Sequence, residues 1–149
     1  MIIKAGQVRS VRCDDIGQRS EEQIGPAGGL QRLGVNIVTL MPGETSTYRH
    51  WHEAEDEFLY LLEGRAVVVE NDGVHEIGPG DMCCWPAGVD NAHHVLNRSN
   101  APARYLVVGS GAERDCVHYP DQGQTMHHQP PRWWVEDAAG NILREGTTD

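Results

Sequence analysis

The chain of 149 residues carries 22 Asp and Glu against 12 Lys and Arg, which gives a formal net charge of −10 at pH 7 with neutral histidines. A nucleic-acid-binding protein normally presents a basic stripe, so this balance excludes nucleic acid as an expected partner. The length suits a single domain with a real hydrophobic core, and because no apolar run approaches about 18 residues and no signal peptide opens the chain, we expect a cytoplasmic protein with no membrane partner.

Short β-like runs separated by turn signals dominate the chain. We expect a strand within residues 2–11 and then a long polar, glycine-rich loop over residues 13–29 that borders the barrel mouth. Further strands are predicted over residues 33–41, 46–52, 57–62, 66–70, 74–77, 82–85, 93–97 and 104–109. After a loop over residues 121–131, residues 133–136 and 142–144 predict a final hairpin. Because no segment between residues 33 and 110 has helical periodicity, these short antiparallel strands predict an all-β jelly roll or closed barrel.

Two sets of residues at fixed spacing lie within these expected strands. The first set, G-x6-H-x-H-x4-E-x6-G, comprises Gly43, His50, His52, Glu57 and Gly64. The second set, G-x5-P-x-G-x4-H-x3-N, comprises Gly80, Pro86, Gly88, His93 and Asn97. An H-x-H pair on a strand places both imidazoles on one face, because side chains alternate along a strand. Three imidazoles and one carboxylate can hold a first-row transition metal and leave positions open for a substrate.

These two sets resemble the two signature motifs of the cupin superfamily. The first departs from that pattern by one extra residue before His50, and the second by a longer gap between Gly88 and His93. The resemblance covers residues 33–110, and the chain is similar to small single-domain bacterial cupins, some of which carry the label sugar-phosphate isomerase. It implies a cupin double-stranded β-helix with short N- and C-terminal extensions within one domain of residues 1–149. It also implies a divalent transition metal held by His50, His52, Glu57 and His93.

Several of these residues have competing interpretations. Glu57 opens a run of apolar residues, and because a buried carboxylate is costly unless paired, we expect it to bind metal and take part in catalysis, or else to be a hydrogen-bonded group beside the metal ligands. Tyr48 shares a predicted strand face with the H-x-H pair, so it is either a catalytic phenol beside the metal or an aromatic core residue. His93 is preferred to His94 as the last ligand because it has the x3 spacing to Asn97. A β-bulge in residues 89–92 would exchange these two roles.

The predicted function is that of a metal-dependent enzyme acting on a small polar organic molecule by Lewis-acid chemistry of the isomerase or lyase type. One alternative is an iron-dependent dioxygenase, and another is a non-catalytic cupin that binds or senses a small molecule. The ligand types do not distinguish iron, zinc, nickel and manganese. A surplus of bulky apolar residues, among them Trp51, Trp133 and Trp134, predicts a homodimer.

Overall fold

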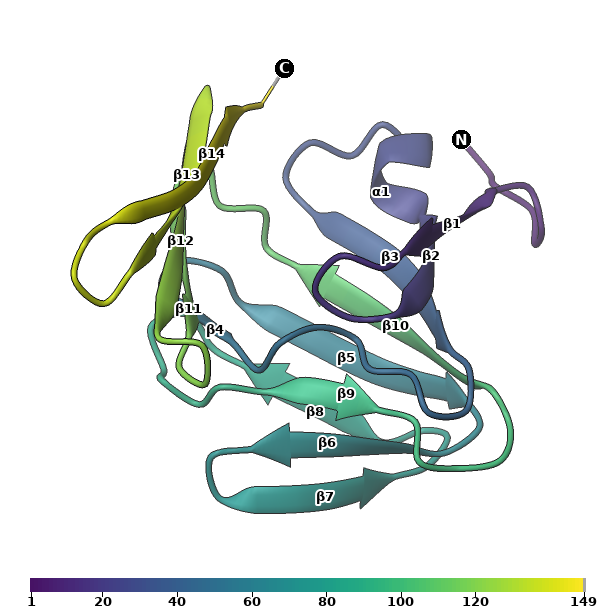
Figure 1. The fold of residues 1–149 in the computed structure, drawn as a ribbon. Coiled ribbons are helices and arrows are strands. Elements are labelled where there is room, and N and C mark those ends of the chain that lie inside the picture. Colours follow the sequence, from purple (N-terminus) through teal and green to yellow (C-terminus); the bar gives the residue numbers. More distant parts are fainter. Residues whose placement is uncertain (149) are drawn as a thin grey trace.

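The computed structural model describes residues 1–148, and nearly all its regular structure is antiparallel strand (Figure 1). The strands are β1 (Ser10–Cys13), β2 (Arg19–Gln23), β3 (Gly34–Leu40), β4 (Trp51–His52), β5 (Glu57–Glu63), β6 (Ala66–Glu70), β7 (Gly73–Ile77), β8 (Met82–Trp85), β9 (His94–Leu96), β10 (Ala103–Gly109), β11 (Asp115–Tyr119), β12 (Gln124–Gln129), β13 (Arg132–Asp137) and β14 (Ile142–Thr147). The single helix within residues 1–148 is α1 (Ile24–Ala27). The all-β prediction is therefore confirmed.

The strands form three sheets, whose orders are β1-β2-β3-β10-β5-β8, β14-β13-β12-β11-β4 and β7-β6-β9. The hydrophobic core lies between the first and the third of these sheets. Leu59 and Leu61 of β5 and Tyr105 of β10 pack there with Val68 of β6 and Val95 of β9. Along β5 and β10 the buried residues alternate with more exposed neighbours, as expected when one face of a sheet is buried. The alternation that predicted the strands also fixes which side chains point inward.

The five-stranded sheet stands at the left of Figure 1, with β12, β13 and β14 at its outer side. The predicted C-terminal hairpin is confirmed, because β13 pairs with β14. The loop predicted over residues 121–131 is wrong for Gln124–Gln129, which forms β12 and pairs with both of its neighbours. This strand lacks apolar alternation because polar side chains cover its outer face. There His127 stacks on Trp134 with ring centroids 4.7 Å apart.

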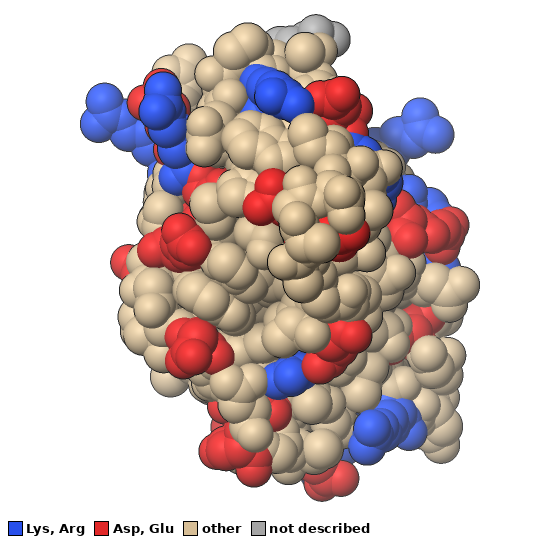
Figure 2. All heavy atoms as spheres, turned by 60° about the vertical axis from the view of Figure 1, so that its left-hand side comes forward, with Lys and Arg blue, Asp and Glu red and all other residues tan. Residues whose placement is uncertain are grey.

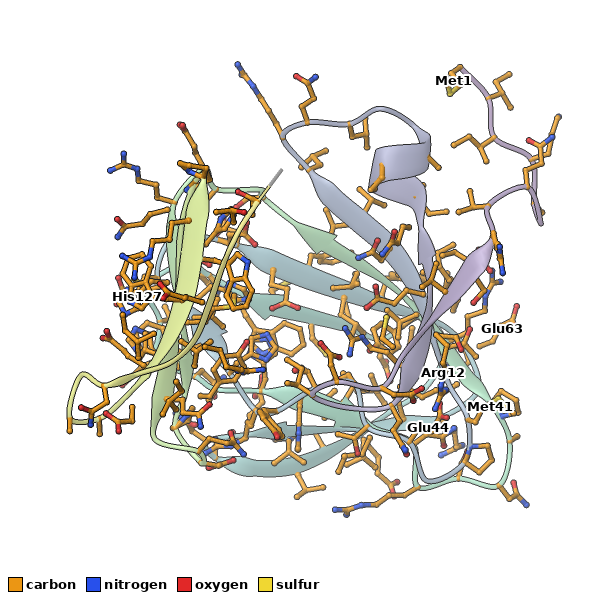
Figure 3. The ribbon with its side chains drawn as sticks, turned by 45° about the horizontal axis from the view of Figure 1, so that its top comes forward. Met1, Arg12, Met41, Glu44, Glu63 and His127 are labelled. Carbon is orange, nitrogen blue, oxygen red and sulfur yellow. The ribbon has the colours of Figure 1, made fainter. Side chains whose placement is uncertain are left out.

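The N-terminal part also differs from the prediction. Most of residues 2–11 lie outside β1, and the loop expected over residues 13–29 contains both β2 and α1. β2 was missed because its sequence, RSEEQ, is polar throughout, although it pairs with β3 along its length. Arg12 of β1 reaches the chain beyond β3, where its Nη1 lies 2.6 Å from Glu44 Oε1 (Figure 3). That ion pair ties the β1–β2 hairpin to the barrel.

The strand expected over residues 46–52 is only partly formed. Residues 47–49 bend, and only Trp51–His52 belongs to a sheet. His50 joins the barrel through an isolated bridge, in which its backbone exchanges two hydrogen bonds with His93. This bridge brings the two spaced motifs of the sequence side by side.

The surface agrees with an acidic protein. Among the described residues on the face shown in Figure 2, Lys and Arg are scattered between Asp and Glu and form no continuous stripe. Within residues 1–148 there is no helix with the length and hydrophobicity needed to cross a bilayer. Homodimer formation stays a prediction.

Candidate metal centre

The four residues predicted as metal ligands come together at one end of the barrel core. The ligand atoms of His50, His52 and Glu57 lie within 4.8 Å of one another. Three imidazole Nε2 atoms point at a single oxygen, Glu57 Oε2. The distances to it are 2.9 Å from His93, 3.6 Å from His50 and 3.6 Å from His52. Three separate segments therefore deliver their side chains to one point.

The opposite ring nitrogen of each histidine is held by a hydrogen-bond acceptor. His50 Nδ1 lies 2.9 Å from the Tyr48 carbonyl oxygen, and His93 Nδ1 lies 3.0 Å from that of Asn91. His52 Nδ1 lies 2.6 Å from Asp115 Oδ2. Carbonyl and carboxylate oxygens only accept, so each Nδ1 carries a proton and donates it. A neutral ring protonated at Nδ1 has a lone pair on Nε2, which is the form that binds a metal.

The three Nε2 atoms and the Glu57 oxygen form a set of ligand atoms that suits a cation. In the neutral tautomers, three nitrogen lone pairs face a carboxylate oxygen at hydrogen-bonding distance or slightly beyond. Like lone pairs repel one another unless a cation lies between them, either as protons on the rings or as a metal ion. Nitrogen and carboxylate donors suit the divalent transition metals, and iron, zinc, nickel and manganese all remain compatible with them. The residues present therefore fit the predicted metal.

The electrostatic environment supports the same conclusion. Burial raises the pKa of the Glu57 carboxyl, but the imidazoles of His50 and His93, when they carry a second proton on Nε2, lower it further and hold that pKa far below its ordinary value. Burial lowers the pKa of His52, whereas the hydrogen bond to Asp115 and the charge of Glu57 raise it, with a net upward shift. The cluster thus keeps a negative charge that needs a positive partner. Trp85 stacks on His93 with ring centroids 3.7 Å apart and shields that side from water.

Asp115 is a candidate functional residue that the sequence did not reveal. It lies at the start of β11, is 8% exposed, and accepts the Ala54 backbone N–H at 2.8 Å as well as the His52 ring N–H. Burial raises the pKa of its carboxyl, but these hydrogen bonds lower it further than burial raises it. Glu55 Oε2 lies 4.0 Å from the same His52 nitrogen. Asp115 therefore fixes the orientation of a candidate ligand, although no spacing pattern connects it to the motifs.

The candidate ligands open into a cavity of about 370 Å³. Its wall is mostly apolar, with Trp85, Val107 and Met126 among the contributors, and it also includes the phenols of Tyr105 and Tyr119. Polar groups enter from β2, which contributes Arg19 and Glu21. These two were missed because their segment was predicted to be a loop. A polar alternation of Arg and Glu carries no sequence signal that separates a cavity wall from a solvated strand.

The predicted catalytic phenol is not part of this wall. Tyr48 is 39% exposed, and its ring centroid lies 6.2 Å from that of Tyr119. The prediction extended the alternation of His50 and His52 backwards, but the bend at residues 47–49 interrupts it. Tyr119 lines the cavity instead, with its ring centroid 6.0 Å from that of His50. Burial raises the pKa of Tyr119, which keeps its phenol protonated.

His93 and His94 occupy different environments, as expected for successive strand residues. His93 is 2% exposed and contacts Glu57, whereas His94 donates from Nδ1 to the Thr47 carbonyl oxygen at 3.0 Å. Burial lowers the pKa of His94. No bulge exchanges the two, so the geometry places His93 in the cluster and His94 at the cavity margin.

Known proteins share this architecture. The family model described as "Cupin domain" matches residues 36–109. A solved structure of a sugar phosphate isomerase from a cupin superfamily, from Silicibacter pomeroyi, is 33% identical with a TM-score of 0.79, over 97% of this chain and 92% of that one. A protein from Acidithiobacillus ferrooxidans, provisionally assigned the same activity, is 26% identical with a TM-score of 0.88, over 96% of each chain.

A curated relative matches part of this chain. The tetracenomycin polyketide synthase protein TcmJ of Streptomyces glaucescens is 35% identical over 69 residues, which make up 46% of this chain. The alignment spans 44% of that relative, so less than half of its length is matched.

Proposed function

The chain belongs to the cupin superfamily, and from this membership and its converging ligand set we propose that it is a metal-dependent enzyme acting on a small polar organic molecule. The observation that carries the proposal is the approach of three Nε2 atoms to Glu57 Oε2 beside a cavity large enough for such a molecule. His50, His52, Glu57 and His93 would hold the metal.

When bound, a divalent metal supplies Lewis-acid polarisation of a carbonyl or enolate oxygen, which suits isomerase or lyase chemistry. The protein's own residues would complete the site. Trp85 and the apolar wall exclude water from the reacting molecule and strengthen electrostatic interactions there. Tyr119, protonated at neutral pH, can donate a hydrogen bond to a substrate oxygen. The similar structure from Silicibacter pomeroyi is described as a sugar phosphate isomerase, which supports the isomerase class for this proposal.

The test is elemental analysis of protein purified without a histidine tag, followed by substrate screening with and without oxygen. Stoichiometric metal with turnover that does not depend on oxygen supports the proposal. Bound iron with substrate-dependent oxygen uptake would contradict the Lewis-acid proposal and indicate an iron-dependent dioxygenase instead. Tight ligand binding without turnover under either atmosphere would favour a binding or sensing protein, and His52→Ala provides the matched metal-deficient control.

A further inference from the structure

The guanidinium of Arg19 lines the cavity, but the carboxylate of Glu21 already neutralises its charge. Arg19 and Glu21 are alternate residues of β2, so both side chains point to the same face, toward the cavity. Arg19 Nε donates to Glu21 Oε1 at 2.5 Å, and Arg19 Nη1 donates to the Ser46 carbonyl oxygen at 2.9 Å. The two side chains are only 18% and 13% exposed, so the pair is largely shielded from solvent. Asp15 adds a more distant carboxylate, 3.7 Å from Nη1.

No other cationic side chain is available to an anionic ligand. Within residues 1–148, Arg19 is the only Lys or Arg that lines the cavity, against three carboxylates, those of Glu21, Glu55 and Glu57. With neutral histidines this wall carries a formal charge of −2, which a divalent metal would bring only to zero. Proteins usually bind phosphate groups with several uncommitted cations or with the N-terminus of a helix. Here the described residues contain no helix longer than the four residues of α1.

We propose that the Glu21–Arg19 pair determines specificity, and that the cavity accepts a phosphate-free α-hydroxyketone while rejecting its phosphate ester. This inference rests on the proposed function, because two ligand oxygens would face the metal. An ester dianion would meet Glu21 at close range in a poorly solvated wall, where like charges repel strongly. A neutral carbonyl or hydroxyl oxygen could instead accept a hydrogen bond from Arg19 Nη2 without displacing Glu21. The apolar wall around Met126 and Val107 suits the carbon skeleton of such a ligand.

The adjacent residue provides a matched control. Glu22 points to the other face of β2 and pairs with Arg104, with Nη2 at 3.1 Å from Glu22 Oε1. It does not line the cavity. Glu21→Gln and Glu22→Gln therefore remove the same charge from neighbouring positions, but only the first releases the cavity guanidinium.

The experiment uses full-length protein loaded with Co²⁺ and follows its visible absorption during titration with dihydroxyacetone or dihydroxyacetone phosphate, two probes that differ only in the phosphate. Wild type should bind dihydroxyacetone about tenfold more tightly than its phosphate or better. Glu21→Gln should improve the affinity for the phosphate about tenfold while that for dihydroxyacetone stays within about threefold. Glu22→Gln should behave as wild type.

A cobalt-loaded wild type that prefers the phosphate, or that binds neither probe, would overturn this inference while leaving the metal site intact. An unchanged preference in Glu21→Gln would also overturn it, provided that the variant retains cobalt. A wild-type protein that retains no cobalt would refute the proposed function and the inference together, so the two failures are distinguishable.

Discussion

Asp115 Oδ2 lies 2.6 Å from His52 Nδ1 and joins the first strand of the C-terminal part to the H-x-H motif of the barrel. The carboxylate fixes the proton of the imidazole on Nδ1 and turns Nε2 toward Glu57. Its second oxygen is occupied by the Ala54 backbone N–H at 2.8 Å, which prevents rotation of the carboxylate. A residue outside the sequence motifs thereby sets the geometry of a residue within them.

Removing this carboxylate should weaken metal binding without abolishing it. We expect Asp115→Ala to raise the dissociation constant of the bound divalent metal by about 10- to 100-fold, because partners of this kind orient and polarise the ligand. Competition with a chromogenic chelator measures the change. Asp115→Asn keeps an oxygen that can accept from Nδ1, so it should lose less affinity. Equal affinities for wild type and Asp115→Ala would show that His52 is positioned by other contacts.

The sequence predicted the barrel, and it predicted that the four candidate ligands would converge, because both depend on local spacing. The strand period placed His50 and His52 on one face, and the spacing to Asn97 selected His93. The structure supplies the reason for that asparagine. Its Nδ2 donates to the Leu40 and Ala101 carbonyl oxygens at 2.8 Å each, which anchors the end of β9 from within the core.

What the sequence did not predict depends on contacts between distant segments. β2 and β12 are polar strands whose pairing partners, rather than their own residues, make them strands. Asp115 acquires its role only when β11 pairs with β4 beside His52. Tyr48 lies outside the cavity wall for the opposite reason, because its predicted placement assumed a regular strand where the chain bends.

His93 and His94 should respond differently to substitution. His93→Ala removes an Nε2 atom that lies 2.9 Å from Glu57 Oε2, so metal occupancy should fall to a small fraction of the wild-type value. His94→Ala removes a hydrogen bond to the Thr47 carbonyl, so it should leave the metal bound and lower the free energy of unfolding by about 1 kcal/mol. Elemental analysis and urea unfolding measure the two effects. Loss of metal from His94→Ala alone would reverse the assignment.

The metal-free protein should lose stability on both sides of a mildly acidic window. The pKa of Glu57 is lowered by folding, so its contribution is present above its ordinary value of 4.5 and is lost as pH falls below it. The pKa of His52 is raised by folding, so its contribution is present below its ordinary value of 6.5 and is lost as pH rises through the folded value. Urea unfolding of the metal-free protein from about pH 3 to about pH 9 measures how the free energy of unfolding depends on pH. Glu57→Gln should reduce the loss of unfolding free energy at acidic pH. A loss as steep as that of wild type would mean that other carboxyl groups cause it.

The two glycines that frame the first motif should differ in what they tolerate. Gly64, between β5 and β6, has φ of 79°, and a Cβ there would clash with the Pro102 carbonyl oxygen, which is backbone and cannot move aside cheaply. Gly43 has φ of 86°, but a Cβ there would meet no atom within 4 Å. Gly43→Ala should therefore cost only the left-handed backbone strain, about 1–2 kcal/mol. Gly64→Ala should cost that strain and, from the clash, about 1–3 kcal/mol more. Urea unfolding of both variants tests the difference, and equal losses would mean that Pro102 imposes no steric limit on this turn.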